Sequence, residues 1–273
     1  MKTEQGIRLG SLSLSRLERT PRLRRLLDRF DWVYTGAEFC ENLLETGMAA
    51  DAARLQAKGK KVCLVTPLLS EKGIESLASI FAGLMKLHRD GRLDPARFEV
   101  TVNDFGALEL AAREKLPFKL NLGRQLYYNA FLVTRDSIEV LNRRSLDFFA
   151  LRGITRYELA PTGLLPRTNF GDKAFGFDPK AFSLTLYYPY LNLTTTRTCL
   201  VGMPYIPPEE AVRGIKCRRE CRACAFKVAH PWIKEKLFIR GNTVFMEFPE
   251  KFYSSQKELA ARRIDRLVYC PFP

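Results

Sequence analysis

Three cysteines crowd into the segment IKCRRECRACAFK, residues 215–227, at positions Cys217, Cys221 and Cys224. Several thiolates packed together repel one another unless a cation neutralises them, so this spacing indicates a metal or metal-cluster site. Unligated thiols in an exposed arginine-rich loop would oxidise, which disfavours three free cysteines. The chain has seven cysteines, an odd number, and in a reducing compartment these argue against a disulfide framework and for metal binding or catalysis.

The other cysteines divide into two groups. Cys63 and Cys270 lie inside apolar runs, where a buried cysteine behaves as a small hydrophobic residue. Cys40 follows an expected strand by a few residues, at the end where parallel-sheet proteins place their chemistry. Cys199 ends the extended segment TTTRTC, with seventeen residues between it and Cys217. The candidate metal ligands are therefore four of the five residues Cys40, Cys199, Cys217, Cys221 and Cys224.

Two kinds of metal site fit this spacing. A structural zinc site usually pairs two C-x2-C hooks, whereas this chain has one tight group and single distant cysteines. A [4Fe-4S] cluster takes four thiolates and accepts irregular spacing from separate loops. The two histidines, His88 and His230, are interpreted as structural or solvent-facing, because a lone histidine is rarely a base without an orienting partner. Spacing alone favours the [4Fe-4S] cluster by a small margin and leaves zinc as the alternative.

The formal charge of +14 is concentrated in two stretches. Residues 1–30 contain eight lysines and arginines against three acids, and residues 211–240 contain nine against two. Concentrated positive charge attracts polyanions such as RNA or anionic lipid headgroups, and it offsets the negative charge of clustered thiolates. Charge alone favours the simpler interpretation, a solvated basic face that aids solubility.

The elements that must position these cysteines alternate between strand and helix up to residue 161. Short apolar runs predict strands at 30–36, 62–70, 98–104, 118–123 and 155–161. Helical periodicity fills the intervals, with one helix between a Ser70 cap and a Gly91 stop and another over 137–153. Strands separated by helices predict a parallel sheet. No glycine-rich phosphate loop follows the strand at 30–36, which counts against an open nucleotide-binding sheet and leaves a barrel.

This alternation stops after Pro161. Residues 162–182 are rich in glycine and proline, residues 183–199 are expected to be extended, and the cysteine-rich segment follows. The run LFIRGNTVFMEF predicts one strand, SSQKELAARRI a helix and DRLVYC a last strand. We therefore predict one α/β domain over residues 1–273, a TIM-barrel-like barrel that is incomplete or distorted. Residues 162–240 would be an irregular cysteine-rich, metal-binding segment within it.

Composition and the first residues narrow the class of protein. With 46% hydrophobic and 27% charged residues the chain can bury a substantial core. The amino-terminal residues lack the apolar core of a secretory signal, and no apolar run is long enough to span a bilayer. We therefore expect a cytoplasmic protein without a transmembrane segment.

Polar residues at or just past the predicted strand ends are candidates for a substrate pocket. Side chains at the carboxyl ends of parallel strands point into the mouth of a barrel, where ligands bind. Each of these residues can equally be a loop cap or a surface polar group. The candidates are Glu38, Asn103, Asn121, Arg124, Gln125, Asn129 and Glu158.

Three stretches of the chain resemble the U32 peptidase family, also described as collagenase-like. They are FDWVYTGAEFC, KLPFKLNLGRQLYYNA, and TRTC followed by the later cysteines. The resemblance covers most of residues 28–240 and is greatest to a short branch of the family that acts in oxygen-independent ubiquinone biosynthesis. It implies a barrel fold.

The resemblance also implies a [4Fe-4S] cluster held by one cysteine after the first strand and three from the later segment. Cys40 and Cys199 fall on matching positions. The C-x3-C pair of the family is reproduced by Cys217 and Cys221, whereas an alignment on the region around Lys227 selects Cys221 and Cys224. The gap after Cys199 is longer than expected for this branch.

The function implied is a subunit of an oxygen-independent hydroxylase. It would act on a hydrophobic quinone precursor, as a heterodimer with a second U32 protein, and the oxygen would come from a donor other than O2. Peptidase activity is disfavoured, because the longer cysteine signature of the collagenase-like members and a G-x-S-x-G elbow are both missing from the sequence.

Two alternatives remain open. Other U32 members are linked to hydroxylation of tRNA uridine, so the chain would instead be a tRNA-modifying protein or its RNA-binding subunit. The basic stretches would contact phosphates and tyrosines would stack on bases, although tyrosines on strands are more often core. These tyrosines are Tyr127, Tyr128, Tyr187, Tyr188 and Tyr190. A zinc-stabilised scaffold without chemistry is a weaker alternative.

Overall fold

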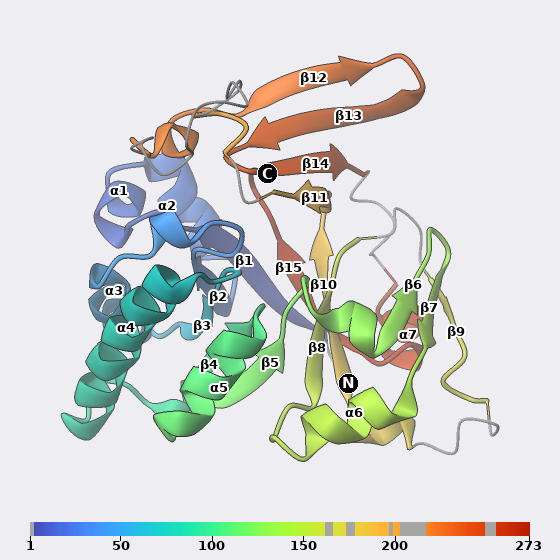
Figure 1. Ribbon diagram of the computed structural model, residues 1–273, viewed down its shortest axis with the longest axis horizontal. Helices are drawn as coiled ribbons and strands as arrows, with labels where there is room; N and C mark the ends of the chain where they lie inside the picture. The colour runs from blue at the N-terminus through green and yellow to red at the C-terminus, as the bar shows by residue number, and fades with distance from the viewer. Residues whose placement is uncertain (1–2, 162–165, 173–177, 197–198, 203–216, 249–254) are drawn as a thin grey trace.

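Eight parallel strands form a closed barrel in the computed structural model, which describes residues 3–161, 166–172, 178–196, 199–202, 217–248 and 255–273. Their order around the barrel is β1-β15-β10-β8-β5-β4-β3-β2 (Figure 1). The bounds are β1 (Glu4–Gly10), β2 (Trp32–Gly36), β3 (Lys61–Val65), β4 (Phe98–Val102), β5 (Lys119–Leu122), β8 (Arg156–Leu159), β10 (Ser183–Tyr188) and β15 (Ile264–Tyr269). The predicted TIM-barrel-like fold is confirmed, and the barrel is complete in its strands rather than incomplete.

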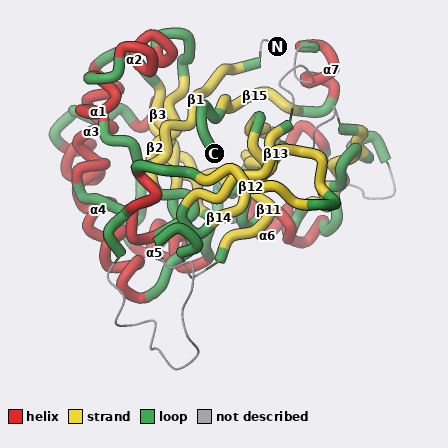
Figure 2. The backbone as a smooth tube through the Cα atoms, turned by 90° about the horizontal axis from the view of Figure 1, so that it is seen from above, coloured by secondary structure: helices red, strands yellow, loops and turns green. Residues whose placement is uncertain are grey.

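Helices α1 to α5 cover one side of the barrel, and α6 and α7 lie on the other side (Figure 2). Their bounds are α1 (Leu14–Glu18), α2 (Pro21–Leu27), α3 (Gly47–Ala57), α4 (Glu71–Arg89), α5 (Phe105–Arg113), α6 (Arg143–Ala150) and α7 (Gln256–Ala261). The predicted ends of the long helix are confirmed: the Ser70 hydroxyl accepts a hydrogen bond from the Gly73 amide, and Gly91 has a φ of +68°. Among the described residues, none of the helices is both long and apolar enough to cross a membrane.

The sequence did not predict the first barrel strand, β1. The predicted strand at 30–36 is β2, and β1 precedes it. The residues of β1 that alternate toward the barrel interior include Glu4 and Arg8, so the strand has no continuous apolar run. The predicted helix at 137–153 was wrong in its first part, because Ser137–Val140 is strand β7 and α6 begins only at Arg143. The side chain of Asn142 caps α6 by accepting a hydrogen bond from the Ser145 amide.

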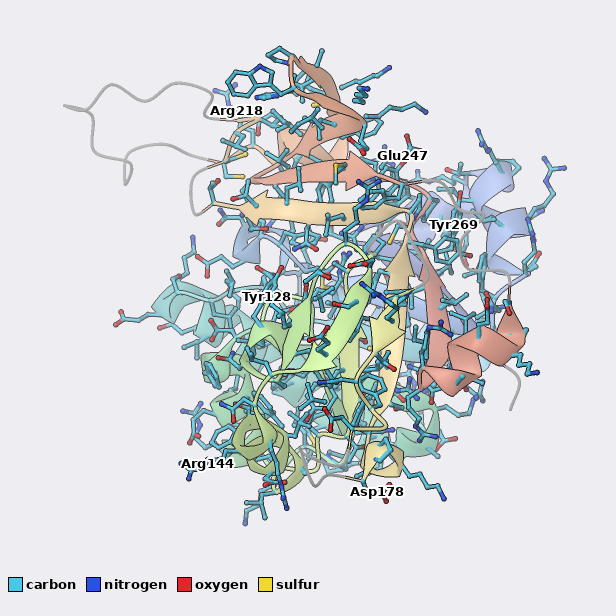
Figure 3. The ribbon with its side chains drawn as sticks, turned by 90° about the vertical axis from the view of Figure 1, so that its right-hand side faces the viewer. Tyr128, Arg144, Asp178, Arg218, Glu247 and Tyr269 are labelled. Carbon is cyan, nitrogen blue, oxygen red and sulfur yellow. The ribbon has the colours of Figure 1, made fainter. Side chains whose placement is uncertain are left out.

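The segment 162–240 is more regular than predicted. Its described part contains barrel strand β10 and three strands of an antiparallel sheet with the order β11-β14-β13-β12. The run LFIRGNTVFMEF is two strands joined by a tight turn at Gly241 and Asn242, instead of one. The bounds are β11 (Tyr190–Thr195), β12 (Phe226–His230), β13 (Ile233–Arg240) and β14 (Thr243–Glu247). This small sheet stands above the barrel mouth, with β11 nearest the barrel and β12 farthest from it (Figures 1 and 3).

A third sheet extends the loop after β5. It consists of β6 (Phe131–Val133), β7 (Ser137–Val140) and β9 (Arg167–Thr168), in that order. The β6–β7 hairpin and α6 together connect β5 to β8. Between β8 and β10 the described residues contain no α-helix, and between β10 and β15 the chain builds the small sheet before α7. The barrel thus departs from regular alternation in its connections.

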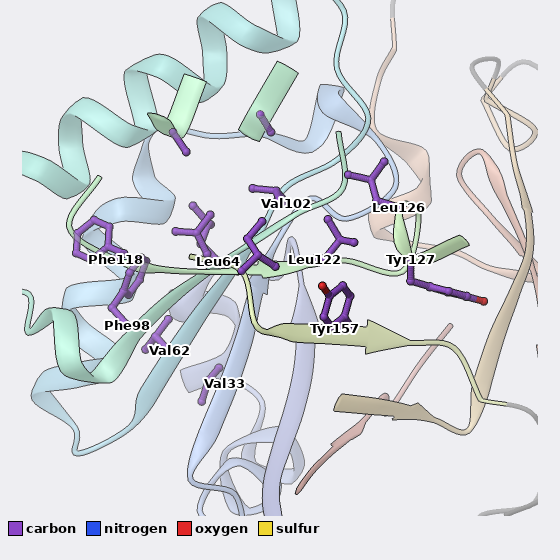
Figure 4. Close-up of a cluster of buried hydrophobic side chains, with 14 of the residues drawn as sticks. Val33, Val62, Leu64, Phe98, Val102, Phe118, Leu122, Leu126, Tyr127 and Tyr157 are labelled. Atoms are coloured by element: carbon purple, nitrogen blue, oxygen red, sulfur yellow. The ribbon is translucent and has the colours of Figure 1, made fainter. Parts of the chain in front are cut away.

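The barrel has two distinct cores. The larger one lies between the strands and the helices and is apolar, with Val33, Val62, Leu64, Phe98 and Leu122 among its fully buried members (Figure 4). The inner core is small and is lined by residues such as Trp32, Tyr34 and Cys63. Charged side chains complete this inner core, so its stability depends on pairing them.

Two ionisable side chains of the inner core, Arg266 and Glu158, are stabilised in different ways. Arg266 donates to Glu99 at 2.6 Å and to Glu4 at 2.9 Å, and this charge holds the pKa of Glu99 below its ordinary value although burial alone would raise it. Glu158 has no cationic partner among the described residues. It accepts hydrogen bonds from Tyr187 at 2.7 Å and from Thr101 at 2.8 Å. Burial raises the pKa of Glu158 to about 7.

This raised pKa predicts a pH dependence of stability. The folded-state pKa of Glu158 lies above the ordinary value of 4.5, so its contribution is fully present below pH 4.5 and is lost as pH rises through about 7. Glu158→Gln should remove this decline, which amounts to about 3 kcal/mol. Urea unfolding from pH 4.5 to 8 measures it. If the free energies of unfolding of wild type and variant change with pH in the same way, Glu158 is already ionised in the folded state over this pH range.

Candidate functional site

A small cavity opens at the carboxyl ends of β1 and β2. The chain after β1, the chain from Gly36 to Cys40, and the turn between β13 and β14 form its walls. Cys40 and Cys221 line the cavity, and Phe39, Phe245 and Phe272 give it an apolar aromatic surface. It lies where a parallel barrel places its chemistry, and two of the predicted metal ligands face it.

Cys40 and Cys221 line this cavity, and Cys199 and Cys217 are among the groups that act on their pKa values. Cys40 follows β2, and Cys221 lies in a single 3-10 turn, Glu220–Arg222. The pKa of Cys40 is raised to about 11, first by burial and then by the nearby thiols of Cys221, Cys217 and Cys199. Burial, Cys199 and Cys217 likewise raise the pKa of Cys221. The fold therefore collects cysteines from widely separated segments, and their thiolates would repel one another without a neutralising cation.

Cys224 is oriented differently. Its sulfur donates to the carbonyl oxygen of Glu220 at 3.4 Å, within its own turn. It is not among the main groups that raise the pKa of Cys40 or Cys221. Cys63 and Cys270 are buried inside the barrel, as predicted. The sulfur of Cys63 lies 3.1 Å from the Thr101 hydroxyl, far from any ligand role at the mouth.

The turn at Gly241 and Asn242 connects the loops that carry the thiols. The Asn242 side-chain amide donates to the carbonyl of Phe39 at 2.8 Å and to that of Thr196 at 2.7 Å. These carbonyls lie one residue before Cys40 and three residues before Cys199. The carbonyl of Gly241 accepts a hydrogen bond from the Leu200 amide at 2.8 Å, just after Cys199. Asn242 is therefore a positioning residue for two of the thiol loops.

Gly241 also brings this turn against the third thiol loop. A Cβ atom on Gly241 would lie 3.5 Å from the sulfur of Cys221, and the φ of Gly241 is +61°. A glycine meets both demands, the left-handed backbone and the close approach. Sequence reasoning missed this turn, although Gly-Asn between two apolar runs is a hairpin signal.

A buried ion network lies directly under the chain that leads to Cys40. Arg124 donates to both carboxylate oxygens of Glu38, at 2.7 Å and 2.8 Å, and Arg8 donates to the same carboxylate at 2.6 Å. Arg124 is 1% exposed and Glu38 3%. Burial alone would raise the pKa of Glu38, but the two guanidinium groups hold it below its ordinary value. The carboxylate is therefore ionised and fixed.

Positive charge surrounds the thiols. Arg240 donates to the carbonyl of Cys221 at 3.1 Å and to that of Pro273 at 2.8 Å, and it has no ion pair within the described residues. Burial and then the charge of Arg8 lower the pKa of Arg240 to about 10. Arg16 of α1 donates to the carbonyl of Arg222 at 3.4 Å, so the two basic stretches of the sequence meet here. These cations favour anionic thiolates.

The predicted pocket residues occupy three different places. Glu38 lines the cavity, and Asn103, Arg124 and Gln125 are hydrogen-bonded beneath it: the Gln125 side chain donates to the Glu38 carbonyl at 2.6 Å, and its amide donates to Asn103 at 3.0 Å. The other three do not point into the mouth, contrary to the prediction. Asn121 bonds Glu99 inside the barrel, Glu158 is enclosed there, and Asn129 caps its own exposed loop.

The predicted stacking tyrosines are also divided. Tyr187 is enclosed in the barrel and bonded to Glu158, which removes it from any base-stacking role. Tyr188 and Tyr190 contact the rings of Tyr269 and Phe238. Tyr127 and Tyr128, with ring centroids 4.2 Å apart, line a second, open hollow of about 840 Å³ at the ends of β5 and β8. Tyr128 alone of the five is largely exposed.

The described side chains do not converge on a single ion. No group of three or more histidine, cysteine, aspartate and glutamate side chains in this part of the chain is placed to hold one metal ion. Tetrahedral zinc takes four donors within about 2.3 Å of one atom, whereas a [4Fe-4S] cluster binds each thiolate to a different iron and sets its four sulfurs farther apart. Four cysteine thiolates are a donor set that either centre accepts.

Comparisons with known proteins identify no family for the chain. No family model and no curated protein matches it. Among solved structures, a GH18 chitinase from Cycas revoluta is 13% identical with a TM-score of 0.42, and covers 97% of this chain and 94% of its own. The spore cortex-lytic enzyme SleL from Bacillus cereus is 11% identical with a TM-score of 0.45, over 98% of this chain and 70% of its own. These TM-scores are below 0.5, so the barrel assignment rests on the strand order itself.

The Asn242 side chain provides a direct test of this arrangement. Asn242→Ala would remove the side-chain donor that bonds the carbonyls of Phe39 and Thr196, which costs about 1–3 kcal/mol of unfolding free energy. It should also free the chain before Cys40, so that a thiol reagent labels Cys40 faster in metal-free protein. Peptide mapping after timed labelling measures this. The matched control is Asn129→Ala, an exposed loop cap. Equal labelling of Cys40 in both variants would show that Asn242 does not position it.

Proposed function

We propose that this chain is an iron–sulfur protein of the U32 type, with a [4Fe-4S] cluster at the barrel mouth. Cys40, Cys199, Cys217 and Cys221 would hold the cluster, and Cys224 would be the spare thiol. The observation that carries the proposal is the meeting of these four thiols beside one cavity, from segments far apart in the sequence. It agrees with the ligand pattern that the family resemblance implies, using the C-x3-C pair.

The surroundings of the thiols support a cluster rather than free cysteines. A cluster with four thiolate ligands is anionic, and Arg240 and Arg8 supply positive charge beside it. Arg240 is half-buried, and its guanidinium donates to backbone oxygens of Cys221 and Pro273. Asn242 and Gly241 connect the ligand loops, which limits the rearrangement that binding would require.

The function that fits this site is oxygen-independent hydroxylation of a hydrophobic quinone precursor. When bound, the cluster supplies electron transfer or activates an oxygen donor other than O2. The chain itself contributes a small cavity whose lining includes the rings of Phe39, Phe245 and Phe272. Glu38 remains ionised between its arginines and does not move a proton at this site. A second U32 protein would be the partner subunit, and the cytoplasm the compartment.

RNA modification is a second candidate, favoured by one observation. The two basic stretches meet through Arg16 and Arg222, close to the thiols, so a polyanion could contact both at once. Filter binding with tRNA distinguishes the two functions. Affinity that is specific for one tRNA and falls steeply with salt supports RNA modification, and its absence favours the quinone precursor.

Metal analysis of anaerobically purified protein tests the cluster and its ligands. Wild type should contain about four irons and four acid-labile sulfides per chain. Alanine at Cys40, Cys199, Cys217 or Cys221 should lower both and bleach the visible spectrum. Cys224→Ala, from the same loop, is the matched control and should keep the wild-type content.

Two outcomes would contradict the proposal. Stoichiometric zinc or no metal in the anaerobic protein would remove the redox function. If Cys224→Ala loses iron while Cys217→Ala keeps it, the ligands in the later segment are Cys221 and Cys224, as in the alternative alignment, instead of Cys217 and Cys221.

A further inference from the structure

The β12–β13 hairpin extends farther from the barrel than any other part of the small sheet. In Figures 1 and 3 the sheet rises from the mouth on its β11 side, and β12 is the outermost strand. Strand β12 pairs only with β13, so its outer edge is free within the described residues. Four of its five residues are exposed. The hairpin is therefore available to contact another molecule and is not part of the core.

The end of the hairpin is apolar. The turn between the strands is Pro231 and Trp232, and Trp232 is 88% exposed. Its one ring contact among the described residues is with His230, at 5.6 Å between centroids. At the other end of β12, Phe226 is 51% exposed. Burying a tryptophan and a phenylalanine from water is favourable by about 1.5–3 kcal/mol each, so leaving both exposed indicates a surface that another body covers.

Free positive charge lies on both strands of the hairpin. Lys227 on β12 and Lys234 on β13 are exposed and have no ion pair among the described residues. Lys236 is paired with Glu247 at 3.2 Å. Arg218 is exposed in the cysteine loop that leads into β12. An exposed tryptophan flanked by lysines matches the interface of a bilayer, where indole lies at headgroup level and ammonium groups reach anionic phosphates.

Aliphatic side chains favour a bilayer over a nucleic acid. On one face of the sheet, Val228, Leu237 and Met246 are register partners, and Ile239 pairs with Phe226. Val228, Ile239 and Met246 are only partly buried. Aliphatic groups partition into acyl chains but offer no ring on which a base can stack. Lys227 alternates with Phe226 and Val228 and so lies on the other face of the sheet, and the exposed Trp232 at the end of the hairpin lies beyond both faces.

We propose that the β12–β13 hairpin docks on an anionic lipid bilayer, with Trp232 at the headgroup boundary and Lys227 and Lys234 against the phosphates. This goes beyond the proposed function and does not depend on the cluster. It would bring the barrel mouth to the membrane surface, where a hydrophobic substrate resides.

Vesicle binding combined with tryptophan fluorescence tests the proposal. The chain has two tryptophans, and Trp32 is buried in the barrel, so the emission lost in Trp232→Phe isolates the hairpin signal. With vesicles of phosphatidylcholine and phosphatidylglycerol, the emission of Trp232 should shift to shorter wavelength and the protein should co-sediment with the vesicles. Vesicles of phosphatidylcholine alone should do so far less, and salt should weaken the binding.

Matched variants assign the binding to the hairpin. Lys227→Gln and Lys234→Gln should each lower the vesicle partition about fivefold, and Trp232→Ala should lower it at least as much. Controls are Lys72→Gln on α4 and Leu151→Ala, an equally exposed apolar residue beyond α6, which should bind as wild type does. Cys40→Ala should also bind normally, so failure of the cluster proposal and failure of this one are distinguishable.

Three outcomes would overturn the docking proposal. Equal partition of wild type and hairpin variants would place the contact elsewhere. A Trp232 shift produced by tRNA but not by vesicles would make the hairpin an RNA surface. A shift that appears on raising protein concentration without lipid would make it an interface between two copies of the chain.

Discussion

The carboxylate of Glu38, held between Arg8 and Arg124, is the interaction on which the barrel mouth depends. Its three members come from β1, from the chain after β2 and from the loop after β5, so the network joins parts of the barrel rim that are distant in sequence. All three side chains are buried, and removing one would leave an uncompensated charge in the interior. Cys40 follows Glu38 by two residues, so the charge pairing fixes the chain just before it, together with the hydrogen bond from Asn242 to the Phe39 carbonyl.

The barrel and the small sheet contribute different parts of the thiol site. A parallel barrel ends its strands at one rim, which supplies Cys40 and the arginines beneath it. The antiparallel sheet returns the chain on itself, and the tight turn at Gly241 and Asn242 presents hydrogen-bonding groups to two loops at once. Neither part holds four thiols alone. The site therefore exists only where the sheet stands on the mouth.

Charged side chains are paired to different extents in the barrel interior and in the small sheet above it. Acidic and basic side chains inside the barrel neutralise one another, as Arg266 does with Glu99 and Glu4. On the hairpin, Lys227 and Lys234 have no ion pair among the described residues, whereas Arg219 and Arg222 of the cysteine loop pair with Glu45. Unpaired cations above a paired interior leave a net positive surface on one side of the molecule, which suits anionic thiolates and anionic partners.

The sequence by itself determined the strand and helix alternation from residue 30 to residue 123, because buried parallel strands require continuous apolar runs. It also identified the cysteines as the chemical feature, since side-chain type and crowding are local properties. It missed β1, whose inward positions are charged, and it merged β13 with β14 because the turn between them is only two residues long. Only the tertiary structure placed Asn121 and Glu158 in the interior. Asn121 and Glu158 are held by partners 22 to 57 positions away, and local pattern contains no information on which separate segments will meet.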